Sequence, residues 1–534
     1  MASVKNLKRM EAKQLVLSLL VGFFIGVLTC AVVISVCSAK DQLSLIYGDW
    51  VNPAGEGKNA SLVSDAGGGQ AEERLSAATN GVVAINQNSS LTNDNVVTPP
   101  LEAPKAADQH GVQSKTSSPT DHSIRKEETT TPKQPGGKDK ANEAPGKPIC
   151  DLSNWRTDVC EMFGDIRINA KSSSVVLVSD HQRHKRQGKD SWQIKPYARK
   201  FDKSAMQHIK EVSVRLSNGP GDTPRCTVAN QSVPALVFAI GGYTGNYYHD
   251  FTDLLIPLFI TARQFNGEVQ FLISTRSFWW IDKYGSILKK LSRHEIVYFD
   301  TDEQVRCHRH VIVGLHSHKP MSIDPARAPN GYSMVDFTKF MRTAYDLERD
   351  SPIRLGKAGG EKPRLLLIPR KGTRRFTNSG DVVKMAEEAG FEVVMAEAGV
   401  SSSVAKFARV VNSCDVMLGV HGAGLTNFVF LPTNAVIIQI IPYGNLEKIS
   451  RDCFKYSSED AGLRYLDYCI GVEESSLIER YPRDDPVFKD PRSIHRLGWK
   501  KMGAVYLDNQ DVKLDVDRFK PILWKAREIL QLGK

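Results

Sequence analysis

Aromatic side chains are absent from residues 51–154, where Ser, Thr, Asn, Gly, Pro, Lys and Glu predominate. A segment of this composition cannot bury enough apolar surface to offset the entropy lost on ordering it. The absence of aromatic residues therefore excludes a folded domain here. We predict a disordered stem over residues 38–147 that acts as a long flexible spacer before the rest of the chain. N-x-Ser/Thr sequons for N-glycosylation occur at Asn59, Asn88 and Asn230.

Charged side chains are absent from residues 15–37, an apolar run long enough to span a bilayer as a helix. The alternative is a cleaved signal peptide with Ser38 and Ala39 at the cleavage site, but the apolar core of such a peptide is normally shorter. Basic residues outnumber acidic ones before the run. The positive-inside rule therefore predicts a cytosolic tail at residues 1–14, a membrane anchor at 15–37 and a luminal remainder, which is type II topology.

The sequence has no C-x-x-C pair and no G-x-G-x-x-G pattern, so a structural zinc site and a dinucleotide fingerprint are not indicated. The net charge of +10 comes without a nucleic-acid-binding module, and we expect no nucleic-acid partner. Of the nine cysteines, seven follow the apolar run, and this odd number leaves at least one unpaired. Cys150 and Cys160 could pair with each other or with other cysteines.

Short apolar runs alternate with helical patterns from residue 148 onward. The predicted strands are 175–178, 236–240, 269–273, 296–299, 311–315, 365–368, 393–395, 416–420 and 436–441. The predicted helices are 246–263, 335–347, 380–389, 404–411 and 516–532. Such alternation indicates parallel sheets with crossover connections. With the Gly- and Lys-rich segment 356–362 as a hinge, we predict an α/β fold of two Rossmann-like domains facing across a cleft, at 148–355 and 356–534.

The segment GVHGAGLTNFVFLP at 419–432 follows an apolar strand and contains three glycines. Glycines let the backbone approach a ligand closely, and the start of the next helix would present free N–H groups to an anion. The candidate phosphate-binding residues of this turn are His421, Gly422, Ala423, Gly424, Leu425 and Asn427. The alternative is a tight strand-to-helix connection whose glycines serve packing only.

A basic cluster, IPRKGTRRFTN at 368–378, follows the strand predicted at 365–368. Its arginines Arg370, Arg374 and Arg375 have the forked geometry that matches phosphate, and the carboxyl end of a strand faces the cleft. The alternative is a solvated basic loop.

A third segment, GGYTGNYYHDFTDLLIPLF at 241–259, leads from a strand into a helix. His249 and Asp253 are four residues apart and share one helix face, an arrangement that can make a general base. Asp250 is an alternative base, and a His–Asp pair that only supports the helix is an alternative to catalysis. The nearby tyrosines could stack on sugar rings or belong to the core.

An acidic triplet, Asp300-Thr301-Asp302, could chelate a divalent metal, because residues two apart on an extended chain face the same way. It reads equally well as a solvated acidic turn, and the glycines and arginines above already offer a phosphate site. We therefore assign no metal ligands and expect no required cofactor.

Five segments, in this order, resemble glycosyltransferase family 61, a plant group that includes xylan arabinofuranosyl- and xylosyltransferases and the N-glycan core β-1,2-xylosyltransferase. They are CDLSNWRTDVCEMFGDIRI (150–168), the three segments above from 241, 370 and 419, and EESSLIERYPRDDPVFKDP (473–491). The resemblance extends from about residue 147 to the C-terminus. The last segment is closer to the branch expanded in grasses, which implies a xylan acceptor.

The resemblance implies a GT-B fold, a type II Golgi membrane protein and a reaction that inverts the anomeric carbon. His249 or Asp250 would be the base, with Asp253 orienting His249. The arginines and the 421–427 turn would hold the diphosphate of a UDP-sugar. Tyr243, Asn246 and Tyr247 would lie on the acceptor side.

The predicted function is therefore transfer of arabinofuranose or xylose from a UDP-sugar to xylan or another polysaccharide, with other Golgi transferases as candidate partners in a complex. Two alternatives remain open: a transferase that acts on glycoprotein glycans, and a non-catalytic Golgi subunit that binds glycans.

Overall fold

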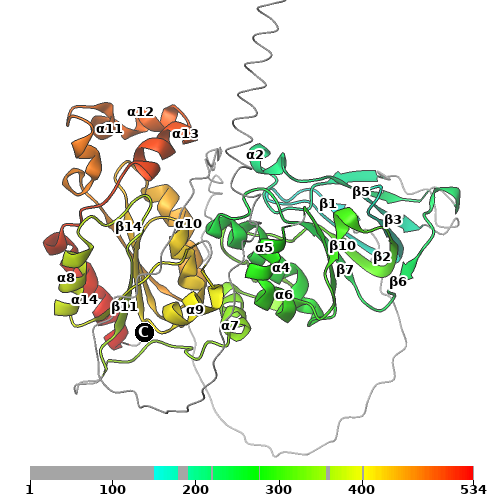
Figure 1. Ribbon diagram of the computed structural model, residues 1–534, viewed down its shortest axis with the longest axis horizontal. Coiled ribbons are helices and arrows are strands. Elements are labelled where there is room, and N and C mark those ends of the chain that lie inside the picture. The colour runs from blue at the N-terminus through cyan, green and yellow to red at the C-terminus, as the bar shows by residue number, and fades with distance from the viewer. Residues whose placement is uncertain are drawn as a thin grey trace, which may run out of the picture. The chain divides into compact units, whose positions relative to one another are not determined.

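A computed structural model describes residues 149–178, 191–217, 220–275, 277–355, 361–399 and 402–532, all within one compact unit, Asn80–Lys534 (Figure 1). The predicted tail at 1–14, the apolar run 15–37, the stem 38–147 and the sequons at Asn59 and Asn88 lie outside the described residues. Among the helices that are described, none is both long and apolar enough to cross a bilayer.

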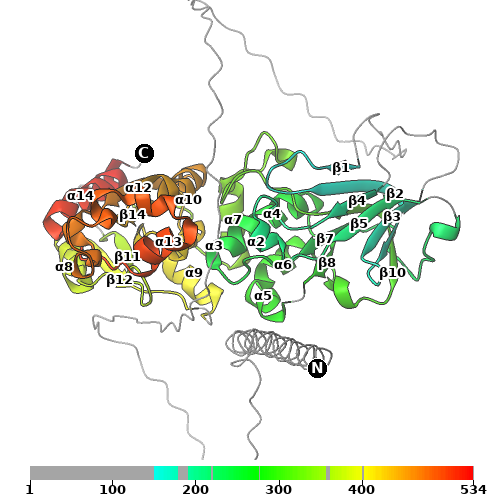
Figure 2. The same cartoon turned by 90° about the horizontal axis from the view of Figure 1, so that it is seen from above.

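The first half of the described chain contains a ten-stranded sheet in the order β4-β5-β3-β2-β10-β7-β8-β9, with β1 beside β2 and β6 beside β10. Its strands are β1 (Cys150–Asp151), β2 (Val159–Asn169), β3 (Ser174–Val178), β4 (Ser191–Ile194), β5 (Val212–Leu216), β6 (Val228–Ala229), β7 (Ala235–Ala239), β8 (Gln270–Ser274), β9 (Val297–Tyr298) and β10 (Val305–Val313). Several of these strands can be followed side by side in Figure 2.

This sheet is mixed, whereas the sequence predicted a parallel one. Strands β10, β7, β8 and β9 are parallel as expected, but β2 runs antiparallel to both β3 and β10. The physical reason is the short connection from β2 to β3, in which Ser173 adopts a positive φ. A tight turn joins antiparallel strands, while a parallel pair needs a long crossover.

Helices cover one face of β7. The helical rod after β7 comprises α3 (Tyr247–His249), the π-helical turn η2 (Asp250–Leu255) and α4 (Ile256–Ala262). The other helices of this half are α2 (Lys203–Met206), α5 (Phe278–Lys283), α6 (Gly285–Leu291) and α7 (Met334–Ala344). Because strand side chains alternate, Leu236 and Phe238 join the core on the helix side, while Val237 joins the core on the opposite face.

The second half contains a five-stranded sheet, entirely parallel, in the order β12-β11-β13-β14-β15. Its strands are β11 (Arg364–Ile368), β12 (Glu392–Met395), β13 (Val416–Val420), β14 (Val436–Ile441) and β15 (Arg464–Cys469). Its main helices are α8 (Ser379–Glu388), α9 (Val404–Asn412), α10 (Glu447–Asp460) and α14 (Val516–Leu532), with the short α11 (Pro486–Lys489), α12 (Pro491–Arg496) and α13 (Trp499–Gly503). This is the doubly wound order of an open α/β sheet.

Both faces of the second sheet are buried. Leu365 and Leu367 of β11 pack in the core formed with α8 and α14, whereas Leu366 belongs to the core that contains α9 residues. Figure 1 shows α8 and α14 on one side of β11 and β14, and α9 and α10 on the other. A strand buried on both faces reads as a continuous apolar run, as β11, β13 and β14 do.

One apolar core is shared by the two halves. Phe251 of η2 packs edge-on against Phe337 of α7 and Phe430 of the second half, with ring centroids 6.3 and 6.4 Å apart. All three are fully buried members of one continuous cluster. The predicted hinge at 356–362 is described only at residues 361 and 362.

Two disulfides stabilise the first sheet. Cys150–Cys160 joins β1 to β2, and Cys226–Cys307 joins the segment before β6 to β10. Asn230, the one described sequon, follows β6 and is partly exposed.

Candidate active site

The rod after β7 carries a histidine–carboxylate dyad. The side chain of Asn246 caps the rod by accepting a hydrogen bond from the backbone N–H of Tyr248. One turn later, Nδ1 of His249 lies 2.9 Å from Oδ2 of Asp253. The carboxylate is completely buried and the imidazole is nearly so. The two predicted partners are therefore in direct contact, on a π-helical turn of the kind often found at functional sites.

Three further side chains surround the Asp253 carboxylate. Nη2 of Arg156 and Nη1 of Arg199 lie 3.4 and 3.6 Å from its Oδ1, and the hydroxyl of Tyr197 donates to Oδ2 over 3.2 Å. Burial alone would raise the pKa of Asp253, but Arg199, His249 and Arg156 together hold it below its ordinary value. An ionised Asp253 accepts a hydrogen bond from the Nδ1–H of His249, which leaves Nε2 as the basic nitrogen.

Asp250 is saturated with hydrogen-bond donors. Its buried carboxylate accepts from the backbone N–H of Gly245, from the indole of Trp280 and from the hydroxyl of Tyr284 over 2.8–3.0 Å. Burial raises its pKa in spite of these donors. The contacts join the rod to the preceding loop and to α5 and α6, so this carboxylate has a structural role in the described chain.

The three predicted acceptor-side residues have different surroundings. Tyr243 lies beside the dyad, with its ring centroid 4.9 Å from that of His249, and its hydroxyl donates to Asp202. Asn246 caps the rod. Tyr247 packs edge-on against Phe251 within the shared core.

The second group of predicted residues gathers where β11 and β13 end. The chain leaves these two neighbouring strands in opposite directions along the sheet. From β11 it continues to β12 on one side, and from β13 it continues to β14 on the other. Such a switch point leaves a crevice at the carboxyl ends of the strands, where open α/β sheets bind ligands. Arg370 and Arg374 follow β11, and His421 and Gly422 follow β13.

Arg370 and Arg374 converge on Gly422. A Cβ atom at Gly422, which has φ +146°, would lie 2.5 Å from Nη1 of Arg370 and 3.2 Å from Nη1 of Arg374. Arg370 donates to the carbonyl of Thr373, and Arg374 donates to the carbonyl of His421. Neither guanidinium forms an ion pair with a carboxylate of the described chain. Glu397 and Asp511 offset part of the charge of Arg370, and Asp508 offsets part of that of Arg374, but at a longer range than an ion pair. Two adjacent, partly buried cations of this kind form a site for an anion such as phosphate.

The electrostatics of this site are cationic. Burial, together with the charge of Arg370, holds the pKa of Arg374 well below its usual value, and burial also lowers the pKa of Arg370. An anion bound here would remove the repulsion between the two guanidinium groups.

His421 is held by a hydrogen-bonded chain. Nε2 of Gln439 lies 2.7 Å from Nδ1 of His421, and the hydroxyl of Tyr465 donates to Oε1 of the same glutamine over 2.7 Å. Burial and then the charges of Arg374 and Arg370 lower the pKa of His421 to about 3. A neutral imidazole that accepts at Nδ1 carries its proton on Nε2, and this N–H can donate to a ligand.

The glycine turn continues as the 3₁₀ helix η6 (Ala423–Phe430), where the sequence predicted an ordinary helix. Ala423 and Gly424 form its first turn, and Leu425 is buried close to Gly419 of β13. The amide of Asn427 donates to the carbonyl of Gly424, so this buried side chain stabilises the turn from within.

Two other predicted features lie apart from these groups. Arg375 is exposed and pairs with Asp511, so the structure does not bring it to the other two arginines. In the acidic triplet, Asp300 accepts from Ser274 and from the backbone of Thr275, and Asp302 pairs with Arg306. Within the described ranges, no cluster of His, Cys, Asp or Glu is arranged to hold a metal.

An aromatic pair connects the dyad with the anion site. The ring of Tyr248 lies 5.5 Å from that of His249 and 5.7 Å from that of Phe454 on α10, and Phe454 lies 5.6 Å from His421. The two predicted groups of residues are therefore parts of one region.

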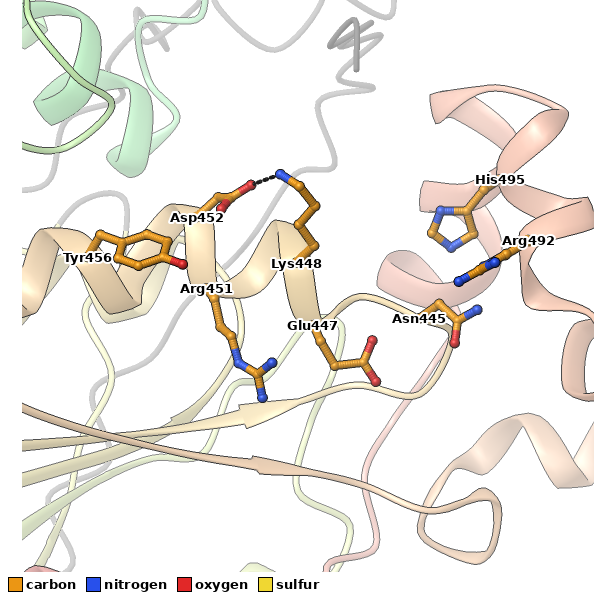
Figure 3. Close-up of a pocket in the computed structure, with 8 residues that line it drawn as sticks. All are labelled: Asn445, Glu447, Lys448, Arg451, Asp452, Tyr456, Arg492 and His495. Atoms are coloured by element: carbon orange, nitrogen blue, oxygen red, sulfur yellow. Dashed lines mark hydrogen bonds and ion pairs between the residues drawn. The ribbon is translucent and has the colours of Figure 1, made fainter. Parts of the chain in front are cut away.

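A cavity of about 520 Å³ lies elsewhere, on the outer face of α10 (Figure 3). It is lined by Asn445, Glu447, Lys448, Arg451, Asp452, Tyr456, Arg492 and His495. Phe454, which contacts His421, belongs to the buried face of the same helix. Most of the charged groups of the cavity are already paired, as Lys448 is with Asp452. The candidate active site is therefore the region of the dyad and the anion site.

Sequence reasoning missed several residues of this region, among them Arg156, Arg199 and Gln439. Arg156 lies in the first of the five family-like segments, but nothing local indicated its contact with Asp253, and Arg199 had no signal. Gln439 had one, since it is the only polar residue in the apolar strand β14. A polar side chain in such a strand needs a buried partner, and here the partners are His421 and Tyr465.

A dyad beside a site for an anion is an arrangement that suits group transfer, and comparison with known sequences identifies the family. Residues 247–438 match the family Glycosyltransferase 61, and the chain belongs to this family.

Its relatives include two alpha-1,3-arabinosyltransferases of rice (Oryza sativa subsp. japonica), XAT3 and XAT2. They are 51% and 50% identical over 72% of the chain. These matches span 66% and 65% of the two relatives, just under two thirds of their length. The rice beta-1,2-xylosyltransferase XYXT1 is 46% identical over 72% of the chain and 84% of its own length.

A solved heptosyltransferase, TibC in complex with ADP-D-beta-D-heptose, aligns with 61% of the chain and 84% of its own at 11% identity. Its TM-score of 0.23 is too low to support an argument about fold.

Proposed function

We propose that the chain is an inverting pentosyltransferase that moves arabinofuranose or xylose from a UDP-sugar onto xylan. The observation that carries the proposal is the pair Arg370 and Arg374, which lies unpaired at the switch point of a doubly wound sheet and close to a histidine–carboxylate dyad. The relatives named above support the sugar, since their names specify arabinosyl and xylosyl transfer.

The proposed reaction is a single displacement. Nε2 of His249 takes the proton from an acceptor hydroxyl as that oxygen attacks the anomeric carbon of the donor. The bond from this carbon to the β-phosphate oxygen breaks, and its electron pair leaves with UDP. Attack from the face opposite the leaving group inverts the anomeric carbon.

The remaining residues stabilise charge as it develops. Arg370 and Arg374 neutralise the departing diphosphate, and the Nε2–H of His421 donates to one of its oxygens. Asp253, ionised between Arg156 and Arg199, stabilises the imidazolium formed on His249. In this scheme His249 is the base, and Asp250 organises the loop and rod around it.

The proposed architecture is GT-B, with the donor bound by the second half and the acceptor by the first. The doubly wound second sheet supports the donor assignment. We propose that a metal ion is not required, because two arginines and a histidine N–H already face the proposed diphosphate position. The engaged carboxylates of Asp300 and Asp302 agree with this.

We further propose that the chain is a type II protein of the Golgi membrane, with the catalytic part luminal and with other Golgi transferases as candidate partners. The apolar run 15–37 with its basic N-terminal flank supports this topology. The two disulfides support an oxidising compartment. Protection of the part after residue 37 from protease in sealed Golgi vesicles would test it.

A donor panel tests the activity. The full-length chain is incubated with UDP-arabinofuranose, UDP-xylose or UDP-N-acetylglucosamine and with either xylo-oligosaccharides or a glycopeptide as acceptor, with and without a chelator. Pentose transfer to xylan in both conditions is expected. Transfer only to a glycopeptide, or to no acceptor, would contradict the proposal, and loss of activity with chelator would contradict the metal-free mechanism.

The role of the base is tested by His249→Ala and Asp250→Asn. We expect His249→Ala to lower kcat by about 10²–10⁴-fold with UDP affinity retained. Asp250→Asn keeps the acceptor oxygen used by Gly245 and Trp280 and places an NH2 group against the hydroxyl of Tyr284, which can turn to accept. This variant should retain most of the turnover. The opposite order of effects would assign the base to Asp250.

A further inference from the structure

Two exposed tryptophans flank the loop and rod that carry His249. Trp155 is 47% exposed and Trp279 is 41% exposed. The predicted acceptor-side aromatics offer less surface, because Tyr247 packs in the core and the ring of Tyr243 lies under Arg199, with the guanidinium carbon 5.1 Å from the ring centroid. Large exposed rings beside a catalytic group are characteristic of a binding surface.

Trp155 is fixed from below by residues that lead to the dyad. Its ring centroid lies 5.0 Å from that of Phe201, and the guanidinium carbon of Arg156 lies 5.3 Å from its ring. Arg156 in turn contacts Asp253. Arg199 lies over both Phe201 and Tyr243, so stacked groups extend without a break from Trp155 to Tyr243, the ring beside His249.

Trp279 lies close to the loop that precedes His249. A Cβ atom added at Gly245 would lie 3.6 Å from Cη2 of Trp279. The backbone N–H of Gly245 donates to Asp250 at the start of η2. Lys283 of the same helix lies 6.0 Å from the Trp279 ring and 5.2 Å from that of Tyr247. This indole is therefore held close to the start of the rod.

The charges around these rings favour a neutral occupant. Arg156 and Arg199 are both buried and both paired with carboxylates, Arg156 with Asp253 and Arg199 with Asp202 and Asp253. The surface at Trp155 therefore has no unpaired arginine to attract an anionic partner. Beside Trp279, the buried carboxylate of Asp250 offsets part of the charge of Lys283. A chain of pyranose rings fits this description, since each ring has an apolar C–H face that stacks on an indole and hydroxyl groups at its edge.

We propose that Trp155 and Trp279 are stacking platforms for the acceptor, each binding a xylopyranose ring of the β-linked chain on either side of the residue that receives the new sugar. The inference rests on the proposed function and extends it to acceptor recognition. Neither indole touches the reacting atoms. Both therefore determine how strongly longer xylan chains bind, whereas the chemical step depends on His249.

The test compares chain lengths in matched variants of the full-length protein. Trp155→Ala and Trp279→Ala are measured with xylohexaose and with xylobiose, both for binding by calorimetry without donor and for KM and kcat with the active donor. Trp524→Ala is the control, because Trp524 is 56% exposed on α14 and contacts Lys520 in the second half. Trp155→Phe and Trp279→Phe keep an aromatic face.

Loss of one stacked ring is expected to weaken xylohexaose binding and raise its KM by about three- to tenfold, with kcat retained. Xylobiose should be affected less, the Phe variants should recover much of the loss, and Trp524→Ala should behave as the wild type. Unchanged xylohexaose binding in both Ala variants, or an equal loss for both chain lengths, would overturn the inference.

The outcomes separate this inference from the proposed function. A wild type that transfers pentose to xylan while both Trp→Ala variants keep its kinetics contradicts the platforms alone. A wild type that binds xylohexaose through both tryptophans but transfers nothing to it contradicts the function alone. A wild type that neither binds nor modifies xylohexaose contradicts both.

Discussion

Arg370 and Arg374 combine a cost to folding with a proposed role in binding UDP. Two neighbouring guanidinium groups repel each other when no carboxylate lies between them. We predict that Arg374→Met lowers UDP affinity by about 10–100-fold, the effect expected from losing a charge-assisted hydrogen bond to phosphate. The same variant should unfold at an unchanged or higher temperature without ligand. Calorimetric titration and thermal unfolding measure the two effects.

Arg375 provides the matched control for this prediction. It is the next residue in the chain, but it is exposed and pairs with Asp511. Arg375→Met should leave UDP affinity within about twofold, since removing an exposed ion pair has a small effect. Equal losses of affinity in the two variants would show that the basic loop attracts UDP only through its overall charge.

His421 gives stability a specific pH dependence. Its pKa is about 3 in the folded chain, against about 6.5 when unfolded. At a pH between these two values, the unfolded chain binds one more proton at this histidine than the folded chain does. The free energy of unfolding therefore rises with pH across this window, and the contribution of His421 to stability is lost as the pH falls from about 6.5 towards 3.

The slope of the unfolding free energy against pH reports how many more protons the unfolded chain binds than the folded chain. We predict that His421→Gln lowers this number by up to about one between pH 4 and 6.5. His318, whose pKa burial lowers to about 4, contributes in the same direction and keeps the slope from vanishing. Urea unfolding at several pH values measures the slope. A slope identical to that of the wild type would show that His421 is protonated in the folded chain.

At the residue scale, local spacing predicted some contacts and missed others. The interval of four residues between His249 and Asp253 was sufficient to predict their contact, since one helical turn separates them. The partners Arg156 and Arg199 lie 97 and 54 positions from Asp253 and reach it only through the fold of the first sheet. Arg375 was grouped with Arg370 and Arg374 by sequence alone, and the turn after β11 separates it from them.

The turn between β13 and η6 depends on one glycine more than on the other. Gly422 has a positive φ and no room for a Cβ atom, whereas the nearest atom to a Cβ at Gly424 would be 3.5 Å away. We predict that Gly422→Ala displaces Arg370 and abolishes measurable UDP binding, while Gly424→Ala binds UDP almost as the wild type does. Calorimetric titration compares the two, and equal affinities would contradict this role of Gly422.

At the element scale, the second sheet was the more predictable. Strands buried on both faces appear as unbroken apolar runs, and β11, β13 and β14 lie within a residue of the predicted bounds. The antiparallel β2 was missed because polar and charged residues interrupt its apolar ones, so it lacks the continuous apolar run that marked the predicted strands. The π-helical turn at Asp250–Leu255 has no sequence pattern of its own.

The shared core makes the described part of the chain one cooperative unit. Since Phe251, Phe337 and Phe430 belong to the same buried cluster, neither half can unfold without exposing apolar surface of the other. We predict a single thermal transition for this part of the chain, coincident by calorimetry and near-ultraviolet circular dichroism. UDP at 100 times its Kd should stabilise the whole transition by about 2.7 kcal/mol. Two resolved transitions, with only one shifted by UDP, would contradict this prediction.

The aromatic cluster also limits how members of the family can be recombined. A chimera that takes its donor-binding half from one enzyme and its acceptor-binding half from another would place side chains from two lineages face to face at Phe251, Phe337 and Phe430. Mismatched volumes there destabilise a close-packed interior. We therefore predict that the two halves are not exchangeable modules, and that a stable hybrid has to inherit both sides of that interior from one parent.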